Sequence, residues 1–285
     1  MDQPDISLYV FAAVIGAAAM HAGWNAILKI RIDPFLAANL VAVFAALLAL
    51  PALLYFGFPA RASWPYLAGS ILVHIGYYWA LTEAYRHADM GQVYPIARGT
   101  APLLTAVVSL LVLREPIGFL PVCGIAVLGA GIIYMAKAGG GKLVDMDATG
   151  VKYALLTALI ICAYTVFDGL GARAAGDPHA YITAYFVLDG VSVLAMALLR
   201  FGPQKVRASF RYAGAGLAGG AMSLGAYWIA IWAMTLAPIG IVAALRETSV
   251  LFAVGISTLL LKEKLSPARA VASLLILAGI VLIRM

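Results

Sequence analysis

Long apolar runs alternate with short polar separators along the whole chain. Each run is close to the roughly 20 residues that an α-helix needs to cross a bilayer. The separators carry charges and turn formers, as in KIRIDP and KEKLSP. The pattern predicts an all-α polytopic membrane protein with ten transmembrane helices. The ten runs fall at about 8–28, 35–57, 65–86, 92–113, 117–136, 151–171, 180–199, 212–235, 239–261 and 267–284.

A glycine-rich, charged stretch, AGGGKLVDMDATG, separates the fifth run from the sixth. We therefore expect a first five-helix repeat at 1–137, an inter-repeat loop at 138–150 and a second five-helix repeat at 151–285. Five crossings are an odd number, so the second copy enters the membrane from the opposite side. Inverted repeats of this kind place a substrate cavity at their interface near the bilayer midplane and suit alternating access.

The two halves also share sequence. Residues 75–93 (IGYYWALTEAYRHADMGQV) align with 224–242 (LGAYWIAIWAMTLAPIGIV) at an offset of 149, with seven identities in 19 positions that include a Gly-x-Tyr-Trp block. Residues 97–116 then align with 245–264 at an offset of 148, which pairs Arg98 with Arg246. The one-residue slip lies beside Pro95, so the arginine equivalence is the weaker part of the repeat.

The composition excludes a soluble domain, because 64% of the residues are hydrophobic and only 11% are charged. The net charge of +6 comes from basic residues between the apolar runs, which indicates topology signals beside a lipid bilayer and no nucleic-acid partner. Thirteen basic residues follow the odd-numbered runs and four lie on the other side, which predicts both termini outside the cytoplasm of a bacterial-type inner membrane. MDQPDIS lacks a basic n-region, so the first run is expected to be a membrane helix.

Catalytic and nucleotide-binding signatures are missing from the sequence. There is no HExxH, no GxSxG and no Walker A motif, and the two mid-run aspartates occur as FDGLG and LDGVS. We therefore expect neither an enzyme nor a cofactor. Cys123 and Cys162 lie in apolar runs and are expected to be buried free thiols. The chain is expected to be able to act as a monomer on a small-molecule substrate.

The ten-run, five-plus-five layout, Gly23-Trp24-Asn25 in the first run, and runs that end in Arg114-Glu115 and in Lys262-Glu263 resemble one known family. They are similar to the EamA-type members of the drug/metabolite transporter superfamily. Among these, the length and the aromatic middle helices look most like the YddG-type exporters. The resemblance implies a secondary transporter that exports aromatic and other neutral amino acids. It names no binding residue of this chain.

The aromatic stretch HIGYYW, residues 74–79, lies near the middle of the third run, where an interfacial aromatic belt is not expected. His74, Tyr78 and Trp79 are candidates for a cavity wall, and helix packing is the alternative. Tyr227 and Trp228 repeat the pattern in the second half.

Polar residues inside membrane helices are functional candidates by default. Arg98 and Arg246, with the nearby Tyr94, are candidates for binding a substrate carboxylate, while snorkelling or a gate ion pair remains open. His21 and Asn25 share a helix face beside Trp24. Asp168 and Asp189 could each bind a substrate ammonium or carry a coupling proton, with helix-end capping or snorkelling as the alternative.

Two further functions were compared with amino-acid export. Proton-coupled export of cationic drugs on the same fold requires a carboxylate deep in the cavity, for which Asp168 is the weak candidate. A purely structural role would not require polar and aromatic faces in both repeats. A hydrated mid-membrane cavity would distinguish the transporters from the structural role.

Overall fold

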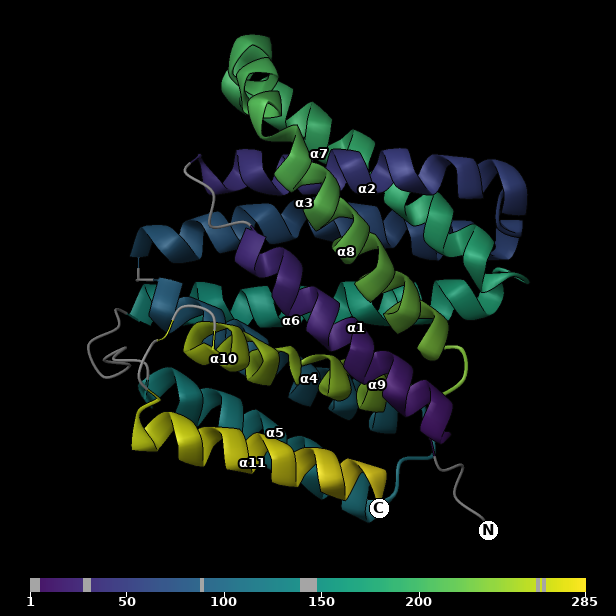
Figure 1. Ribbon diagram of the computed structural model, residues 1–285. Coiled ribbons are helices and arrows are strands. Elements are labelled where there is room, and N and C mark those ends of the chain that lie inside the picture. Colours follow the sequence, from purple (N-terminus) through teal and green to yellow (C-terminus); the bar gives the residue numbers. More distant parts are fainter. Residues whose placement is uncertain (1–5, 28–31, 88–89, 139–147, 260–261, 263–264) are drawn as a thin grey trace.

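The described part of the chain is helical throughout and contains no strand in the computed structural model (Figure 1). It covers residues 6–27, 32–87, 90–138, 148–259, 262 and 265–285, with the backbone alone at 78, 81–82, 85–86, 90–95 and 136–138. The helices of the first half are α1 (Leu8–Ile27), α2 (Pro34–Phe56), α3 (Trp64–His87), α4 (Met90–Leu111) and α5 (Phe119–Ala138).

The second half follows the same order but divides one helix. The predicted run at 239–261 is interrupted by a turn at Arg246–Ser249, which gives two short helices in place of one. The helices are α6 (Ala148–Ala174), α7 (Pro178–Ser209), α8 (Ala213–Ala233), α9 (Ile239–Arg246), α10 (Ser249–Leu259) and α11 (Pro267–Arg284). Short 3₁₀ turns precede α3 and α8, at Arg61–Ser63 and Phe210–Tyr212.

Six stretches of the described residues are long and apolar enough to cross a membrane. Two shorter apolar helices, at Ile96–Leu111 and Phe119–Met135, accompany them. Integral membrane association therefore follows from the helices, and the count of ten crossings stays a prediction. The run predicted at 180–199 is longer in the structure and ends at Ser209. The helix bends at Gly202, which has a φ of 77° and is followed by Pro203.

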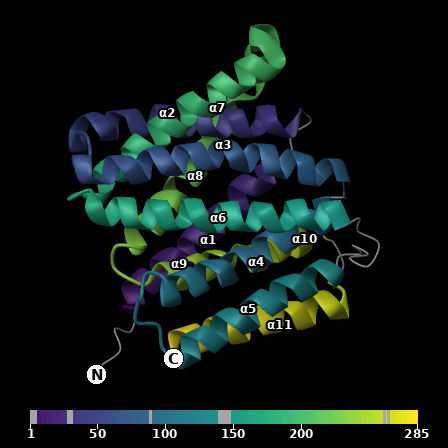
Figure 2. The same cartoon turned by 180° about the vertical axis from the view of Figure 1, so that it is seen from behind.

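Helices of the two halves pack mainly against each other. The first helix of each half lies against the third helix of the other, so that α1 packs on α8 and α6 packs on α3. The second helices pair as α2 with α7, and the fifth as α5 with α11 (Figures 1 and 2). The start of α1 and the end of α11 lie at the same end of the bundle (Figure 1). Because the helices of the two halves alternate in this way, a cavity at the interface is lined by helices of both halves.

Matching local structures mark equivalent positions in the two halves. Asp33 and Asp177 each cap a helix that has proline at its first position, and their carboxylates accept from the backbone N–H two residues on, at 2.8 Å in both cases. Arg114 and Lys262 are the non-glycine residues with positive φ in the described chain, at 55° and 56°. The basic residue of each Arg-Glu or Lys-Glu pair thus adopts the same uncommon conformation.

Close approach of α8 to α2 depends on glycine. A Cβ added to Gly220 would lie 2.8 Å from the Ala45 nitrogen, and one added to Gly216 would lie 2.7 Å from the Phe44 ring. The Gly216-x-x-x-Gly220 spacing therefore serves a contact inside the chain.

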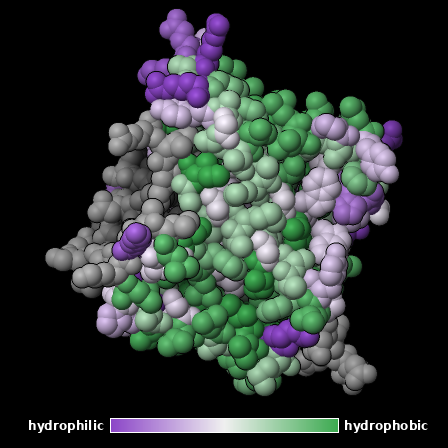
Figure 3. All heavy atoms as spheres, in the orientation of Figure 1, coloured by the Kyte–Doolittle hydropathy of each residue, from purple (hydrophilic) through white to green (hydrophobic). Residues whose placement is uncertain are grey.

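The outer surface matches a lipid environment. Hydrophobic side chains cover much of the visible face, and hydrophilic ones gather over the projecting connection from α7 to α8 (Figure 3). The last part of α7 and the 3₁₀ turn that follows it carry exposed basic residues, namely Arg200, Lys205, Arg207 and Arg211.

Candidate functional site

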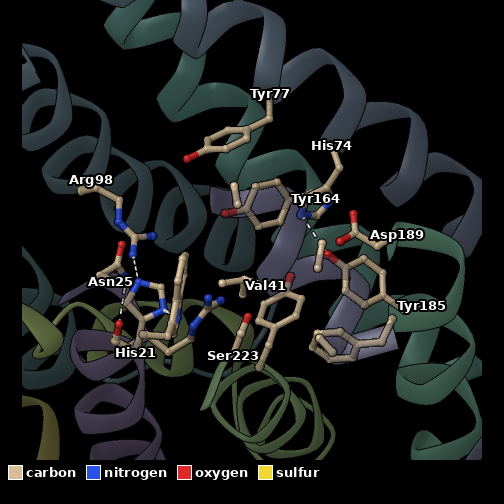
Figure 4. Close-up of a pocket in the computed structure, with 17 residues that line it drawn as sticks. His21, Asn25, Val41, His74, Tyr77, Arg98, Tyr164, Tyr185, Asp189 and Ser223 are labelled. Atoms are coloured by element: carbon tan, nitrogen blue, oxygen red, sulfur yellow. Dashed lines mark hydrogen bonds between the residues drawn. The ribbon is translucent and has the colours of Figure 1, made fainter. Parts of the chain in front are cut away.

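A cavity of about 170 Å³ lies between the two halves, lined from α1, α2, α3 and α4 on one side and from α6, α7, α8 and α9 on the other. Its wall combines guanidinium groups, a carboxylate and several aromatic rings with small apolar residues of α2 (Figure 4). Among the described side chains, no group of three His, Cys, Asp or Glu converges in a way that would hold a metal ion.

Two arginines and one glutamate form the basic end of this cavity. Arg98 of α4 lies 3.3 Å from the carboxylate of Glu247, which belongs to the turn between α9 and α10. Arg246 places its guanidinium carbon 4.7 Å from the centre of the Tyr227 ring. The second oxygen of Glu247 is buried and has no hydrogen-bond partner in the described structure. Two guanidinium groups thus share this end of the cavity with one directly contacting carboxylate.

His21 stands between two groups that can only donate. The Trp24 indole N–H donates to its Nδ1 at 3.2 Å, and the Arg98 guanidinium contacts its Nε2. A neutral imidazole has one N–H and one acceptor nitrogen, so it cannot accept from both neighbours. If Nδ1 accepts from Trp24, Nε2 carries the proton, and two donors face each other at Arg98. The two groups are in direct contact, so an acceptor could serve both only after they move apart.

A second polar group lies toward the other end of the cavity (Figure 4). The His74 Nδ1 lies 3.0 Å from the Ser70 carbonyl, and its Nε2 lies 3.1 Å from the Tyr185 hydroxyl. A neutral imidazole that donates through Nδ1 and accepts through Nε2 satisfies both contacts. The His74 ring also lies against the Tyr164 ring, with centroids 4.1 Å apart.

Asp168 lies behind this wall and is completely buried. Its Oδ1 accepts from the Tyr181 hydroxyl at 3.0 Å, and its Oδ2 accepts from the Tyr227 hydroxyl. The Tyr181 ring passes directly over Gly171, where an added Cβ would lie 2.4 Å from it. Glycine on α6 thus lets a tyrosine of α7 reach the carboxylate. Because Tyr227 also lines the cavity, it connects Asp168 to the wall.

Asp189 of α7 lines the cavity itself (Figure 4). It makes no hydrogen bond or ion pair within the part of the chain that the structure describes. Asp168 is the neighbouring ionisable group whose charge reaches it.

Some lining positions repeat between the halves, at an offset that differs from one helix pair to the next. His74 and Ser223, at an offset of 149, and Arg98 and Arg246, at an offset of 148, are equivalent pairs that line the cavity. The matched Asp-Pro caps set an offset of 144 between α2 and α7, since 33 and 34 correspond to 177 and 178. At that offset three of the four lining residues of α2 correspond to those of α7, namely Val41, Ala42 and Ala45 to Tyr185, Phe186 and Asp189. This part of the cavity is therefore symmetric in position and asymmetric in chemistry.

Seven of the predicted residues border the cavity, namely His21, Trp24, Asn25, His74, Arg98, Tyr227 and Arg246. The structure places Trp79 elsewhere, because it is 56% exposed and lies against Tyr153 on the outside of the bundle. Trp228 turns away from the cavity and donates to His179 at 2.9 Å. The side chains of Tyr78 and Tyr94 lie outside the described residues.

Sequence reasoning did not include several lining residues among its candidates. Tyr77 and Ser223 were overlooked beside their stronger neighbours, and Tyr164 and Tyr185 were not considered. Asp189 was considered for an ammonium group or a coupling proton, but it was not assigned to the cavity wall. The two Asp-Pro dipeptides carried a usable signal, because they align α2 with α7 and bring Asp189 opposite Ala45.

Comparison with known proteins agrees with the two-half layout. The sequence profile of the EamA-like transporter family matches residues 7–137 and again residues 148–285. The chain belongs to the EamA-like transporter family. Members of this family are membrane transporters of small molecules, which accords with a non-enzymatic role.

The solved structures add a fold-level match to this EamA-like chain. One of them, described only as a crystal structure of a protein, superposes with a TM-score of 0.76. It is 18% identical, and the alignment covers 96% of this chain and 97% of that one. At this identity the likeness shows the fold alone. No curated protein matches the chain.

Arg114-Glu115, part of the EamA-type resemblance, connects the two halves. Glu115 forms an ion pair of 2.6 Å with Arg173 and accepts from the backbone N–H of Ile239, the first residue of α9, at 2.9 Å. The Ser109 hydroxyl donates to the same carboxylate. Arg173 also donates to the carbonyls at the end of α8 and before α9. Glu115 thus fixes the chain before α5 to the ends of α6 and α9. Glu263 lies outside the described residues.

Proposed function

We propose that this protein is a secondary transporter that exports small amphipathic metabolites, with aromatic and other neutral amino acids as its main cargo. It would act by alternating access between two inverted five-helix repeats, 1–137 and 151–285, joined by the loop at 138–150, in a bacterial-type inner membrane. The observation that carries the proposal is the basic, aromatic-walled cavity between the halves.

The basic end of the cavity supports recognition of a carboxylate. Two guanidinium groups lie at this end of the cavity, and the fork of donors on each can bind a carboxylate. His21 and Arg98 also present donors to each other when Nδ1 of His21 accepts from Trp24. A substrate carboxylate that moves the two groups apart would accept from both.

The size and walls of the cavity support a small cargo with an aromatic or aliphatic body. Drug-sized ligands occupy pockets of roughly 300–1,000 Å³, whereas this cavity measures about 170 Å³. The rings of Tyr164, Tyr185 and Tyr227 supply surfaces on which an aromatic side chain can stack.

Alternating access draws support from the paired positions. Two halves that exchange conformations require matching structures. This chain has equivalent lining residues, equivalent helix caps and crossed packing of α1 with α8 and of α6 with α3. The Glu115–Arg173 ion pair ties the halves together at the end of α6, where a gate would open.

Transport by reconstituted protein tests the proposal. We would measure uptake and counterflow of labelled phenylalanine, leucine, sugars and organic cations in liposomes, comparing wild type with Arg98→Gln. Loss of one charge-assisted contact, worth about 1.5–3 kcal/mol, would raise the KM for amino acids by about 10- to 150-fold. Arg200→Gln, on the exposed last part of α7, is the matched control. Equal transport by Arg98→Gln, or no amino-acid transport at all, would refute this cargo.

Export of cationic drugs is a second candidate, favoured by the position of Asp189 in the cavity wall. The small volume of the cavity disfavours it. Cation uptake without amino-acid uptake in the same panel would favour it.

A further inference from the structure

The cavity carries one carboxylate that the proposed substrate contacts do not use. Asp189 takes the position that Ala45 holds in the other half, so the repeat alone does not account for it. An ionised carboxylate in a membrane interior is costly unless a cation or donors compensate it. None of the described residues gives Asp189 a hydrogen bond or an ion pair.

The groups around Asp189 do not supply a cation. On α3, His74 is satisfied as a neutral imidazole, and on α2 the nearest lining residues are Val41, Ala42 and Ala45. The α7 and α8 tyrosines nearby, Tyr185 and Tyr227, are neutral hydroxyl carriers. On α6, Tyr164 is neutral and Asp168 brings a second acid. Arg98 lies across the cavity from Asp189, beyond the Tyr164 ring (Figure 4).

The hydrogen bonds divide the two acids into different roles. Both oxygens of Asp168 accept from tyrosine hydroxyls, so this group holds the negative charge. The positive charge of the Arg246 guanidinium also favours the ionised form of Asp168. Asp189 lacks such donors and faces the charge of Asp168, and two carboxylates so placed do not both ionise readily. When no substrate is bound, Asp189 is therefore the acid that carries a proton, and Asp168 is the one that is ionised.

We propose that Asp189 is the coupling-proton site of the transporter. The inference rests on the transport function proposed above and adds its energy source. Asp189 holds a proton while the cavity is empty, and it releases that proton when the ammonium group of a substrate binds nearby. A carboxylate binds a proton or a cation but not both at low cost, so each substrate that enters sends one proton out of the cavity. Such exchange drives export when protons are more concentrated outside.

The position of the proton can be tested without any substrate. We expect infrared spectra of purified wild-type protein near neutral pH to contain the carbonyl stretch of a buried, protonated carboxylic acid. Asp189→Asn should lose this band, and Asp189→Glu should keep it at a shifted frequency. Asp177→Asn is the control on the same helix, since asparagine caps a helix as well as aspartate. Absence of the band in wild type, or its persistence in Asp189→Asn, overturns the assignment.

The coupling can be tested with two ligands that differ only by the ammonium group. In weakly buffered detergent solution, binding of L-phenylalanine should release about one proton per molecule, the most that a single carboxyl group can give up. Binding of 3-phenylpropionate, which has no ammonium group, should release none, and Asp189→Asn should release none with either ligand. Equal release by both ligands, or no release with bound phenylalanine, overturns the coupling.

The two tests separate the inference from the function beneath it. If phenylalanine neither binds nor undergoes counterflow, the amino-acid cargo is wrong, and the infrared band still decides whether Asp189 carries a proton. If counterflow is present but no proton moves, the transport function stands and the coupling site falls.

Discussion

Glu115 offers the clearest test of how the two halves are held together. Its side chain is 8% exposed and joins the 32% exposed Arg173 to the N-terminus of α9. Glu115→Gln keeps the size and an amide oxygen for the Ile239 N–H but removes the charge. Removal of one member of a buried ion pair costs about 3–5 kcal/mol. Because Arg173 is partly solvated and keeps two carbonyl acceptors, we expect about 2 kcal/mol.

Hydrogen exchange at the first amides of α9 measures this effect directly. A loss of about 2 kcal/mol corresponds to about 30-fold faster exchange where opening of this end exposes the amides. Exchange in α11, which packs on α5, should change little. Asp33→Asn is the control, because it preserves an exposed helix cap.

A double-mutant cycle with Arg173→Met isolates the ion pair from the other contacts of each residue. Neighbouring charged residues in one network are coupled by about 0.5–3 kcal/mol. Coupling indistinguishable from zero, or less than threefold faster exchange in Glu115→Gln, would refute the idea that this pair closes the end of the bundle.

Two further outcomes follow from the packing and from the cavity wall. Gly220→Ala should lower stability by about 1–3 kcal/mol, because the added methyl group overlaps α2. Gly214→Ala on the same helix meets open space and should be neutral or stabilising. Thermal unfolding of both variants in detergent measures the difference. Trp79→Ala should leave amino-acid uptake within about twofold, while Tyr164→Ala should raise KM about three- to tenfold through the loss of an aromatic contact. Equal effects of the two aromatic substitutions on uptake would contradict the cavity wall described above.

The apolar runs and the repeated residues were sufficient to predict a helical membrane protein built from two related halves. A helix surrounded by lipid must satisfy its own backbone, so run length and hydrophobicity alone predict membrane helices. The predicted and observed ranges of α11 both span 267–284. The pairing of Arg98 with Arg246 also placed two cavity residues correctly, since both line the cavity.

Helix phase was the main source of error in the candidate site. The repeat alignment made Trp79 and Trp228 equivalent, yet one faces outward beside Tyr153 and the other donates to His179. Each residue step rotates a side chain by about 100°, so neighbours on one helix face different surroundings. Identity of sequence therefore did not show which of Tyr77 and Trp79 borders the cavity.

The sequence by itself determined that this chain enters a membrane as two related sets of helices with charges and rings inside them. Only the tertiary structure decided which groups meet. Glu247 pairs with Arg98 in the other half, 149 residues away along the chain. The sequence offered Asp168 and Asp189 as two equal candidate acids, and the fold distinguishes them by placing Asp189 in the cavity wall and Asp168 behind it. Such pairings depend on helix crossing and rotation, which the period of a hydrophobic pattern does not encode.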